Sequence, residues 1–358
     1  MELGIIGLPQ SGKTTLFNAL TQGNIPTGIS GGKLSIHTAV IDVPDERLET
    51  LGSMFKPQKL VHAKVTYADI AGLDGQSAQT GISGTLLNTL SQMDGFIHVV
   101  RQFENPLVPH FAGSVNPERD FASMEAELLL NDLLLVERKL ERLEEERQRG
   151  GFGRDKALLE REVSLFKRLA ETLSQEIPLR QVTFSEEEEK QLSSYGLLTR
   201  KPQLIVINQS EDQPPTTIET SSTNKTIIHI PAKLEMEITQ LPPEDAALFL
   251  DEYGIEEPSL KRFIRLSYAL LDLISFFTVV GEKEVRAWTI KRGSTALDAA
   301  GKVHTDMARG FIRAEVIGFD ELAALGGFSE ARQQGKLRLE GKKYIVQDGD
   351  VVTIRFNL

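Results

Sequence analysis

Residues 7–14 read GLPQSGKT, and they follow directly after a short apolar run, Leu3–Ile6. The motif G-x-x-x-x-G-K-[ST] between a strand and a helix is typical of a phosphate-binding loop. Its two glycines let the backbone curl so that successive N–H groups face one anion, and the start of the helix adds its positive end. We expect Lys13 to contact the β- and γ-phosphates and the Thr14 hydroxyl to bind Mg²⁺. The expected phosphate-binding residues are Gln10, Ser11, Gly12, Lys13, Thr14 and Thr15.

Further short apolar runs follow along the chain, with helix-like patterns between them. They lie at Ala39–Val43, Lys64–Ile70, Phe96–Val100, Gln203–Ile207 and Thr226–Ile230. Most are flanked by a turn signal or a helix start. Strands that alternate with helices indicate an α/β domain with a largely parallel sheet. The expected fold class is therefore α/β, a P-loop NTPase (G-type) domain, and a length of 358 residues predicts further domains.

The alternation of strands and helices breaks between residues 121 and 199. Apolar residues there repeat in steps of four and three, a heptad seam with charged residues between them. The seam consists of Leu129, Leu133, Val136, Leu140 and Leu143, and a second helical run carries Leu159, Phe166, Leu169 and Leu173. The glycine-rich stretch 149–155 reverses the chain between them, so we expect an antiparallel helical arm. A further helix is expected in the stretch 185–190, SEEEEK, with Ser185 as its cap.

Residues 279–358 read as a separate unit. Alternating runs occur at Val285–Ile290, Phe311–Val316, Tyr344–Val346 and Val351–Phe356, around a central helical stretch. This is the pattern of a small β-grasp domain. The predicted organisation is a nucleotide-binding domain in residues 1–120 and 200–278, an inserted helical arm in residues 121–199 and a β-grasp domain in residues 279–358.

The composition excludes several classes of protein. The chain contains no cysteine, which excludes a disulfide framework and a thiolate metal site. A net charge of −11 argues against nucleic-acid binding over the whole surface, and no DNA partner is expected. Residues 281–358 hold 13 Lys and Arg against 11 Asp and Glu, so this part repels a polyanion least. Because no signal peptide or membrane-spanning stretch is recognisable, we expect a cytoplasmic protein without membrane contact.

A second motif, DIAGL (69–73), lies at the end of a predicted strand. In switch-type P-loop NTPases an aspartate there holds Mg²⁺ through water, and the glycine three residues later senses the γ-phosphate through its N–H. Asp69 and Gly72 are therefore the expected catalytic residues together with Lys13, and Asp69 belongs to the expected metal site. Leu73 stands where Ras-like GTPases carry the glutamine that orients the attacking water. Because leucine cannot hydrogen-bond water, hydrolysis needs another group, a backbone contact or a partner.

Two loops after later strands read as base-binding loops. The stretch NQSE (208–211) stands where a guanine-specific site carries N-K-x-D, whose aspartate binds two donors of guanine. The lysine is absent here and the acid is one methylene longer, so guanine selectivity is expected to be weakened. The second loop, Pro231–Lys233, follows the strand TIIHI. The expected nucleotide-binding residues of the two loops are Asn208, Gln209, Glu211, Ala232 and Lys233.

With these motifs in this order, the sequence resembles the Obg-like ATPase family (YchF), which belongs to the translation-factor-related P-loop NTPases. The stretches that carry the resemblance are GLPQSGKTTLFNALT (7–21), VPDERLETL (43–51), DIAGL (69–73), HVVRQFEN (98–105) and NQSE (208–211). The most distinctive is KEVRAWTIKRGSTALDAAGKVHTDMARGFIRAEVI (283–317), the signature of a TGS domain. TGS domains are β-grasp modules of RNA- and ribosome-linked proteins.

The resemblance implies a slow ATP-hydrolysing switch with Mg²⁺ as cofactor and a preference for ATP over GTP. It also implies the ribosome or a ribosomal subunit as partner, with rRNA contact through the TGS domain and the helical arm. Two alternatives stay open, a GTP-preferring translation-linked GTPase and a nucleotide-binding module with weak or lost hydrolysis. A P-loop kinase is disfavoured because such kinases need neither NQSE nor DIAGL.

Two regions depart from the family's pattern. The family usually has asparagine and valine at the positions of Gln10 and Ser11, and in related NTPases that asparagine helps to hold a monovalent cation. The family also carries a Mg²⁺-binding threonine in a stretch that reads Pro-Phe-x-Thr-x-x-Pro-Asn. Counting along the chain places this threonine near Lys33, with Ser35 and Thr38 as alternative ligands.

Overall fold

The structure is a computed structural model, and it describes residues 1–26, 35–71, 82, 84–149, 155–214, 226–253, 255 and 257–357. The chain divides into two compact units. The first consists of Met1–Ala39 and Thr66–Leu260, and the second of Val40–Val65 and Lys261–Leu358. The nucleotide-binding motifs found in the sequence all belong to the first unit.

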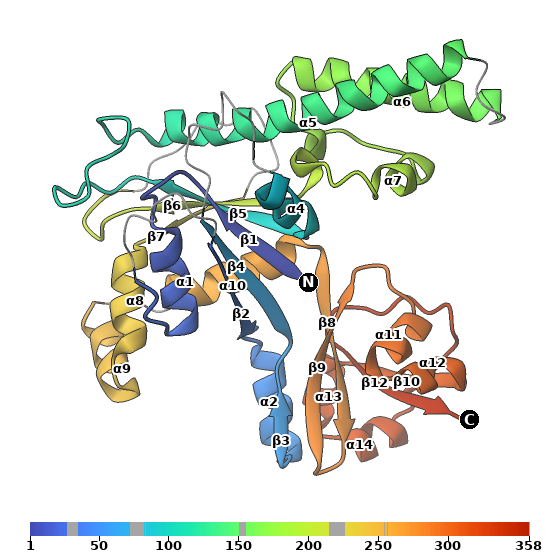
Figure 1. Cartoon of the computed structure of the whole chain (residues 1–358). Coiled ribbons are helices and arrows are strands. Elements are labelled where there is room, and N and C mark those ends of the chain that lie inside the picture. The colour runs from blue at the N-terminus through green and yellow to red at the C-terminus, as the bar shows by residue number, and fades with distance from the viewer. Residues whose placement is uncertain are drawn as a thin grey trace. The chain divides into compact units, whose positions relative to one another are not determined.

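The sheet of the first unit has six strands in the order β2-β4-β1-β5-β6-β7 (Figure 1). These are β1 (Glu2–Ile6), β2 (Ser35–Asp42), β4 (Lys64–Ala71), β5 (Gly95–Arg101), β6 (Gln203–Asn208) and β7 (Thr226–Ile230). β1 pairs in parallel with β4 and β5, and β6 pairs in parallel with β5 and β7. Every residue of β5 and β6 is buried, as expected for central strands of a parallel sheet. The predicted α/β class is confirmed.

The helices of the first unit include α1 (Lys13–Thr21), α4 (Gly84–Gln92), α8 (Ala232–Gln240) and α9 (Pro243–Glu252). A further helix, α10 (Ser259–Leu270), belongs almost entirely to the second unit. α1 and α8 pack against each other, which brings the loops at their N-termini together (Figure 1). α4 buries Leu86 and Leu90 in a core with Ile6, Ile70 and Phe96 of the strands. The sheet and helices thus hold the carboxyl ends of β1, β4, β5 and β6 in fixed positions, where the ligands of an open parallel sheet bind.

The predicted helical arm is present. It consists of α5 (Pro117–Gln148), α6 (Lys156–Ser174), α7 (Glu186–Leu192) and two 3₁₀ turns, η2 (Leu179–Gln181) and η3 (Leu198–Arg200). α5 has 32 residues and is therefore about 48 Å long. The predicted reversal at residues 149–155 lies outside the described residues except for its two ends, Arg149 and Asp155. No helix in the described part of the chain is both long and apolar enough to cross a membrane.

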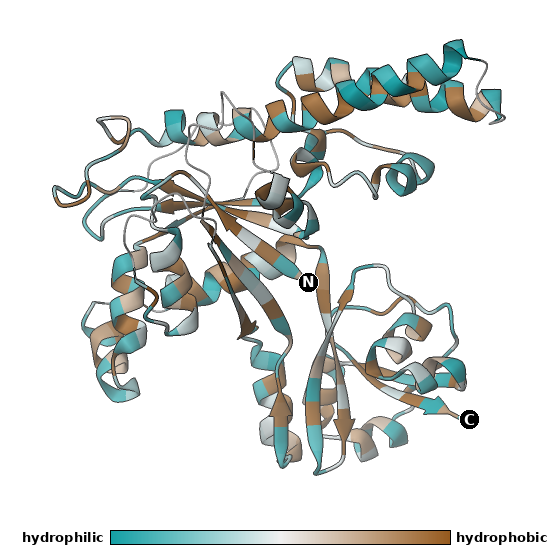
Figure 2. Cartoon of the chain, viewed as in Figure 1, coloured by the Kyte–Doolittle hydropathy of each residue, from teal (hydrophilic) through white to brown (hydrophobic). Residues whose placement is uncertain are grey.

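The seam of the arm follows the predicted spacing. Leu129, Val136 and Leu143 are buried against the second helix, and Leu133 and Leu140 are partly buried at the same interface. The side on which α5 and α6 meet is hydrophobic, whereas their outer surfaces are mostly hydrophilic (Figure 2). Ser185 caps α7, as predicted from the sequence. The Glu188 side chain also accepts from the Ser185 backbone N–H, which completes a capping box that was not predicted.

The second unit has its own sheet, in the order β11-β10-β12-β8-β9-β3. Its strands are β3 (Lys59–Val61), β8 (Leu273–Val280), β9 (Glu284–Lys291), β10 (Phe311–Gly318), β11 (Arg338–Glu340) and β12 (Asp350–Phe356). Its helices are α2 (Glu46–Phe55), α11 (Ala296–Val303), α12 (Thr305–Arg309), α13 (Phe319–Leu325) and α14 (Phe328–Gln333). The strand predicted at Tyr344–Val346 was wrong, because only a single bridge joins Thr295 and Ile345 there. The Tyr344 hydroxyl and the Gln347 backbone N–H both donate to Asp350, which shapes a turn instead.

A segment from the N-terminal half of the chain completes this second sheet. β3 pairs in parallel with β9, and α2 packs against the same strand. The Arg47 guanidinium forms ion pairs with Asp45 and Asp348 and lies over the ring of Phe277, at 5.3 Å. This grouping differs from the predicted domain limits, which place residues 40–65 and 261–278 in the nucleotide-binding domain. The limits of the separately folding domains stay a prediction.

Candidate nucleotide-binding site

The loop of residues 7–14 has a backbone that only its glycines permit. Gly7 and Gly12 have φ angles of 149° and 96°, and Gln10 also has a positive φ, 62°. A Cβ on Gly7 would lie 2.3 Å from the carbonyl oxygen of Val99, and a Cβ on Gly12 would lie 2.0 Å from Asn208 Nδ2. Both positions therefore require glycine for conformation and for space. The curled backbone predicted from the motif is present.

Positive charge gathers at the end of this loop. Helix α1 begins at Lys13 with Gly12 as N-cap, and no side-chain hydrogen bond caps it. The Lys13 ammonium donates to the backbone oxygens of Gly7 and Leu8, at 2.8 and 3.0 Å, so it lies across the loop. The first turn of α1 holds no acidic residue. A lysine and a helix N-terminus at one loop form a site for a phosphate group.

Asp69 and Thr14 meet beside the lysine. The Thr14 hydroxyl donates to Asp69 Oδ2 at 2.8 Å. Asp69 is 2% exposed, and its second oxygen, Oδ1, has no hydrogen-bond partner among the described residues. Burial raises the pKa of this carboxyl, while the Thr14 hydrogen bond and the charges of Lys13 and His37 oppose the shift. The structure thus brings the two predicted metal-site residues together.

Asn208 links three parts of the site. Its Nδ2 donates to the backbone oxygen of Ser11 at 2.9 Å, and its Oδ1 accepts from the backbone N–H of Ala232 at 3.2 Å. Asn208 is buried at the end of β6, and Ala232 is buried at the start of α8. One amide therefore fixes the phosphate loop against both predicted base loops. The sequence predicted each of these residues but not the bonds that join them.

The other predicted residues of the base loops differ in their surroundings. Gln209 is partly buried, and its backbone N–H donates to Ile230 at 3.2 Å. Glu211 is exposed, and no hydrogen bond or ion pair holds its side chain in the described part of the chain. The Lys233 side chain is 83% exposed and pairs with Glu237 at 3.8 Å, so Lys233 lies at the surface.

Several predicted residues fall where the structure is not described. Gly72 and Leu73 lie in the segment 72–81, and Lys33 lies in the segment 27–34. Ser35 and Thr38, the alternative metal ligands, lie in β2, where Ser35 is partly buried and Thr38 is exposed. Of the remaining predicted residues, Thr15 is partly buried in the first turn of α1, and Ser11 is buried with its hydroxyl unpaired among the described residues.

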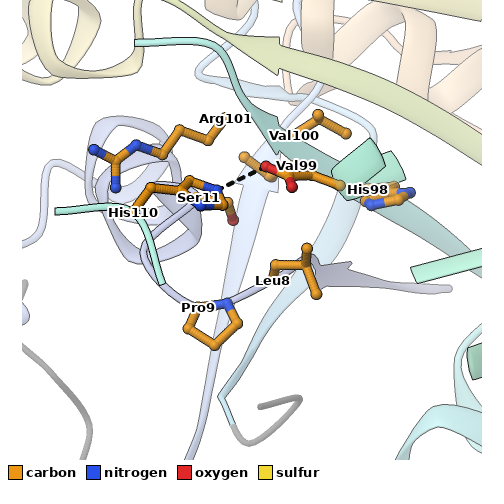
Figure 3. Close-up of a pocket in the computed structure, with 9 residues that line it drawn as sticks. Leu8, Pro9, Ser11, His98, Val99, Val100, Arg101 and His110 are labelled. Carbon is orange, nitrogen blue, oxygen red and sulfur yellow. Dashed lines mark hydrogen bonds and ion pairs between the residues drawn. The ribbon is translucent and has the colours of Figure 1, made fainter. Parts of the chain in front are cut away.

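A small pocket lies behind the phosphate loop (Figure 3). It is lined by Leu8, Pro9 and Ser11 of the loop, by His98–Arg101 of β5, and by His110 and Asp120. Arg101 is 2% exposed and donates to the backbone oxygens of Phe103 and Val108, at 3.1 and 2.7 Å. Its guanidinium also lies over the Phe103 ring, at 4.4 Å, and burial lowers its pKa. Arg101 therefore fixes the chain that leaves β5 beside Gly12.

The same pocket connects the phosphate loop to the arm. His110 Nε2 lies 2.7 Å from Asp120 Oδ2 in the first turns of α5, and both side chains are almost fully buried. The other oxygen of Asp120 accepts from Arg119 Nε at 3.0 Å. The first turns of the arm are thus held against the strand that supports the loop. Sequence patterns did not predict Arg101, His110 and Asp120 as neighbours of the site, and the one signal for them was the stretch 98–105.

A glycine-rich loop between β1 and α1, a lysine across it and a threonine–aspartate pair beside it define a P-loop NTPase of the GTPase type. Family models agree with this class. Residues 2–139 match the model described as a 50S ribosome-binding GTPase. Residues 273–357 match the YchF GTPase C-terminal model, which is described as a protein of unknown function.

The chain belongs to the YchF family. It is 40% identical to the ribosome-binding ATPase YchF of Bacillus subtilis, over the whole length of both chains. It is 38% identical to the ribosome-binding ATPase YchF of Escherichia coli O157:H7, over all of this chain and 99% of the relative. The solved structure of the Schizosaccharomyces pombe YchF GTPase matches 99% of this chain and 97% of its own, with a TM-score of 0.83 at 28% identity.

Proposed function

We propose that this chain is a ribosome-associated switch that binds ATP with Mg²⁺ and hydrolyses it slowly. The observation that carries the proposal is the arrangement of Lys13, Thr14 and Asp69 around one phosphate loop. The ribosome as partner is supported by relatives of the same length whose names state ribosome binding and ATPase activity. Because the proposed partner is the ribosome, we propose the cytoplasm as the location of the protein.

The residues present fit a magnesium ion. Mg²⁺ takes oxygen ligands in octahedral geometry and is usually held by one or two protein oxygens together with substrate phosphates. Thr14 and Asp69 offer a hydroxyl and a buried carboxylate with one oxygen left unpaired among the described residues. When held by Thr14 and Asp69, Mg²⁺ would supply positive charge against the negative charge that develops on the phosphates.

The chain's own groups would then divide the remaining work. Lys13 would move from the loop carbonyls to the β- and γ-phosphates, where its charge stabilises the leaving and transferred groups. Gly72 is the proposed sensor of the γ-phosphate through its backbone N–H. Asn208 would hold the phosphate loop and the base loops in one arrangement before nucleotide arrives, which lowers the ordering cost of binding.

Substitution of Asp69 by asparagine tests the metal site. Asparagine keeps the size of the side chain and removes the charge, so Mg²⁺-dependent affinity for ATP should fall about tenfold or more. Titration of ATP with and without Mg²⁺ measures this, and Asp320→Asn, at an exposed position in α13, is the matched control. Unchanged Mg²⁺ dependence in Asp69→Asn would contradict the assignment of Asp69.

The base preference is the second part of the proposal. A guanine-specific acid accepts from two donors on one edge of the base, and Glu211 with its longer side chain departs from that arrangement. Measuring the affinities for ATP, ADP, GTP and GDP on one preparation tests this. Tenfold tighter binding of GTP, about 1.4 kcal/mol, would replace the ATP assignment with the GTPase alternative.

The other alternative is a nucleotide-binding module with weak or lost hydrolysis, which Leu73 favours. Release of phosphate from ATP with Mg²⁺ separates it from the proposal. Intact binding without phosphate release would support the module. We further propose that the chain belongs to the Obg-like group, that residues 279–358 form a TGS domain, and that this domain and the arm contact rRNA.

A further inference from the structure

Three glutamines join the loops that follow β5 and β6. These strands are parallel neighbours, so the chain leaves both at the same edge of the sheet (Figure 1). Gln102 follows β5, and its backbone N–H donates to the backbone oxygen of Asn208 at 2.8 Å. Gln102 Nε2 also donates to the backbone oxygen of Pro214 at 3.2 Å. The segment that carries Glu211 is therefore held at both of its ends by one residue.

Gln213 closes this segment from within. Its Oε1 accepts from the backbone N–H of Ser210 at 3.0 Å, and its own backbone N–H donates to Ser210 at 3.2 Å. Its Nε2 donates to the backbone oxygen of Gln102 at 3.3 Å. Gln209 Nε2 donates to the backbone oxygen of Gln213 at 3.1 Å. Both ends of the Gln213 amide are thus used to fix a loop of six residues, 208–213.

Glu211 belongs to the loop that these hydrogen bonds hold. Glu211 is exposed, and no hydrogen bond or ion pair from a described side chain orients its carboxylate. The position of the Glu211 carboxylate therefore depends on the backbone of the loop. Gln213 and Gln102 hold this backbone through hydrogen bonds to Ser210 and Pro214. A carboxylate can discriminate between bases only if it stays opposite one particular edge. Adenine presents one donor and one acceptor on that edge, whereas guanine presents two donors and a carbonyl acceptor.

We propose that Gln213 is a positioning residue that sets base selectivity by holding Glu211 in place. This inference rests on the proposed function of the site as a nucleotide site and adds the residue that determines its specificity. Without the Gln213 amide, Ser210 N–H and Gln102 C=O lose the hydrogen bonds that this side chain supplies, and the loop samples more conformations. A mobile carboxylate adapts to either base, so the ratio of the ATP and GTP affinities moves toward one.

The first experiment compares affinities in the full-length chain. In Gln213→Ala the affinity for the preferred base should fall about fivefold, the equivalent of one net hydrogen bond, and that for the other base less than about twofold. Gln213→Glu keeps the acceptor for Ser210 and loses the donor to Gln102, so it should be intermediate. Gln175→Ala, exposed at the end of α6, is the control and should match the wild type. Equal losses for both nucleotides in Gln213→Ala would overturn the proposal.

The second experiment tests whether Gln213 acts through Glu211. In a chain that already carries Glu211→Ala, the further change Gln213→Ala should alter ATP affinity less than about twofold. Independent, additive losses would overturn the positioning role. A wild-type chain that prefers GTP would contradict the ATP assignment alone, because a ratio that moves toward one in Gln213→Ala still supports the role of Gln213.

Discussion

Replacement of Lys13 by alanine is expected to lower the rate of ATP hydrolysis about 10²- to 10³-fold. The ammonium crosses the phosphate loop in the structure, where it donates to the backbone oxygens of Gly7 and Leu8. Loss of one preorganised charge from the transferring phosphoryl group removes transition-state stabilisation that water does not replace. Phosphate release with saturating ATP and Mg²⁺ measures the effect.

The control for this experiment is Lys156→Ala, at the first position of α6 and exposed. It should retain the wild-type rate. The thermal midpoint of Lys13→Ala, measured on the same preparation, checks that the variant is folded when its rate is measured. A Lys13→Ala chain that hydrolyses ATP at the wild-type rate would show that the loop does not cradle the reacting phosphates.

The second large effect concerns stability and falls on Asp132. This carboxylate is fully buried in α5 and accepts from the backbone N–H groups of Leu198 and Thr199 and from the Thr199 hydroxyl, at 2.9, 2.7 and 2.7 Å. Alanine there would leave three buried donors without a partner, at about 1–3 kcal/mol each before relaxation. We expect Asp132→Ala to lose about 3 kcal/mol or more of stability in the first unit.

Thermal melting followed by circular dichroism at a helix-sensitive wavelength measures this loss. Asp132→Asn keeps an acceptor oxygen and should fall between the wild type and Asp132→Ala. Asp251→Ala, at an exposed position in α9, is the matched control and should have the same thermal midpoint as the wild type. A midpoint for Asp132→Ala that is indistinguishable from the control would mean that the arm does not depend on this anchor.

The anchor also bears on how the arm connects to the site. η3 leads directly into β6, and β6 ends at Asn208, which bonds to the phosphate loop and to α8. At its other end, α5 is tied through Asp120 and His110 to the chain that leaves β5 beside Gly12. Both ends of the arm are therefore attached to strands that support the nucleotide site. An arm rooted in this way is suited to respond to changes at the nucleotide.

Sequence patterns predicted the parts of the fold that depend on interactions between residues close together in the chain. The phosphate loop is a contiguous motif whose glycines are needed for its own backbone, and the arm is a heptad seam readable at steps of three and four. Short apolar runs predicted five of the sheet's strands closely. The remaining strand, β2, begins four residues before the predicted run.

Contacts distant along the chain were not predictable from such patterns. β3 has three residues, and what makes it a strand is its parallel partner β9, more than two hundred residues later. Asp132 appears in the sequence as one more polar residue beside a seam, although its carboxylate oxygens accept from the backbone N–H groups of η3, more than sixty residues later. Gln213 likewise has no motif, since its bonds depend on where β5 and β6 leave the sheet.

The measurement that tests the account most directly is co-sedimentation of the full-length chain with ribosomes in defined nucleotide states. If ATP and hydrolysis operate a switch, affinity for the ribosome should differ between a non-hydrolysable ATP analogue with Mg²⁺ and ADP. A coupling of about fivefold or more is expected for a switch of this kind, and Lys13→Ala should abolish the difference. Equal association in both nucleotide states would contradict the account.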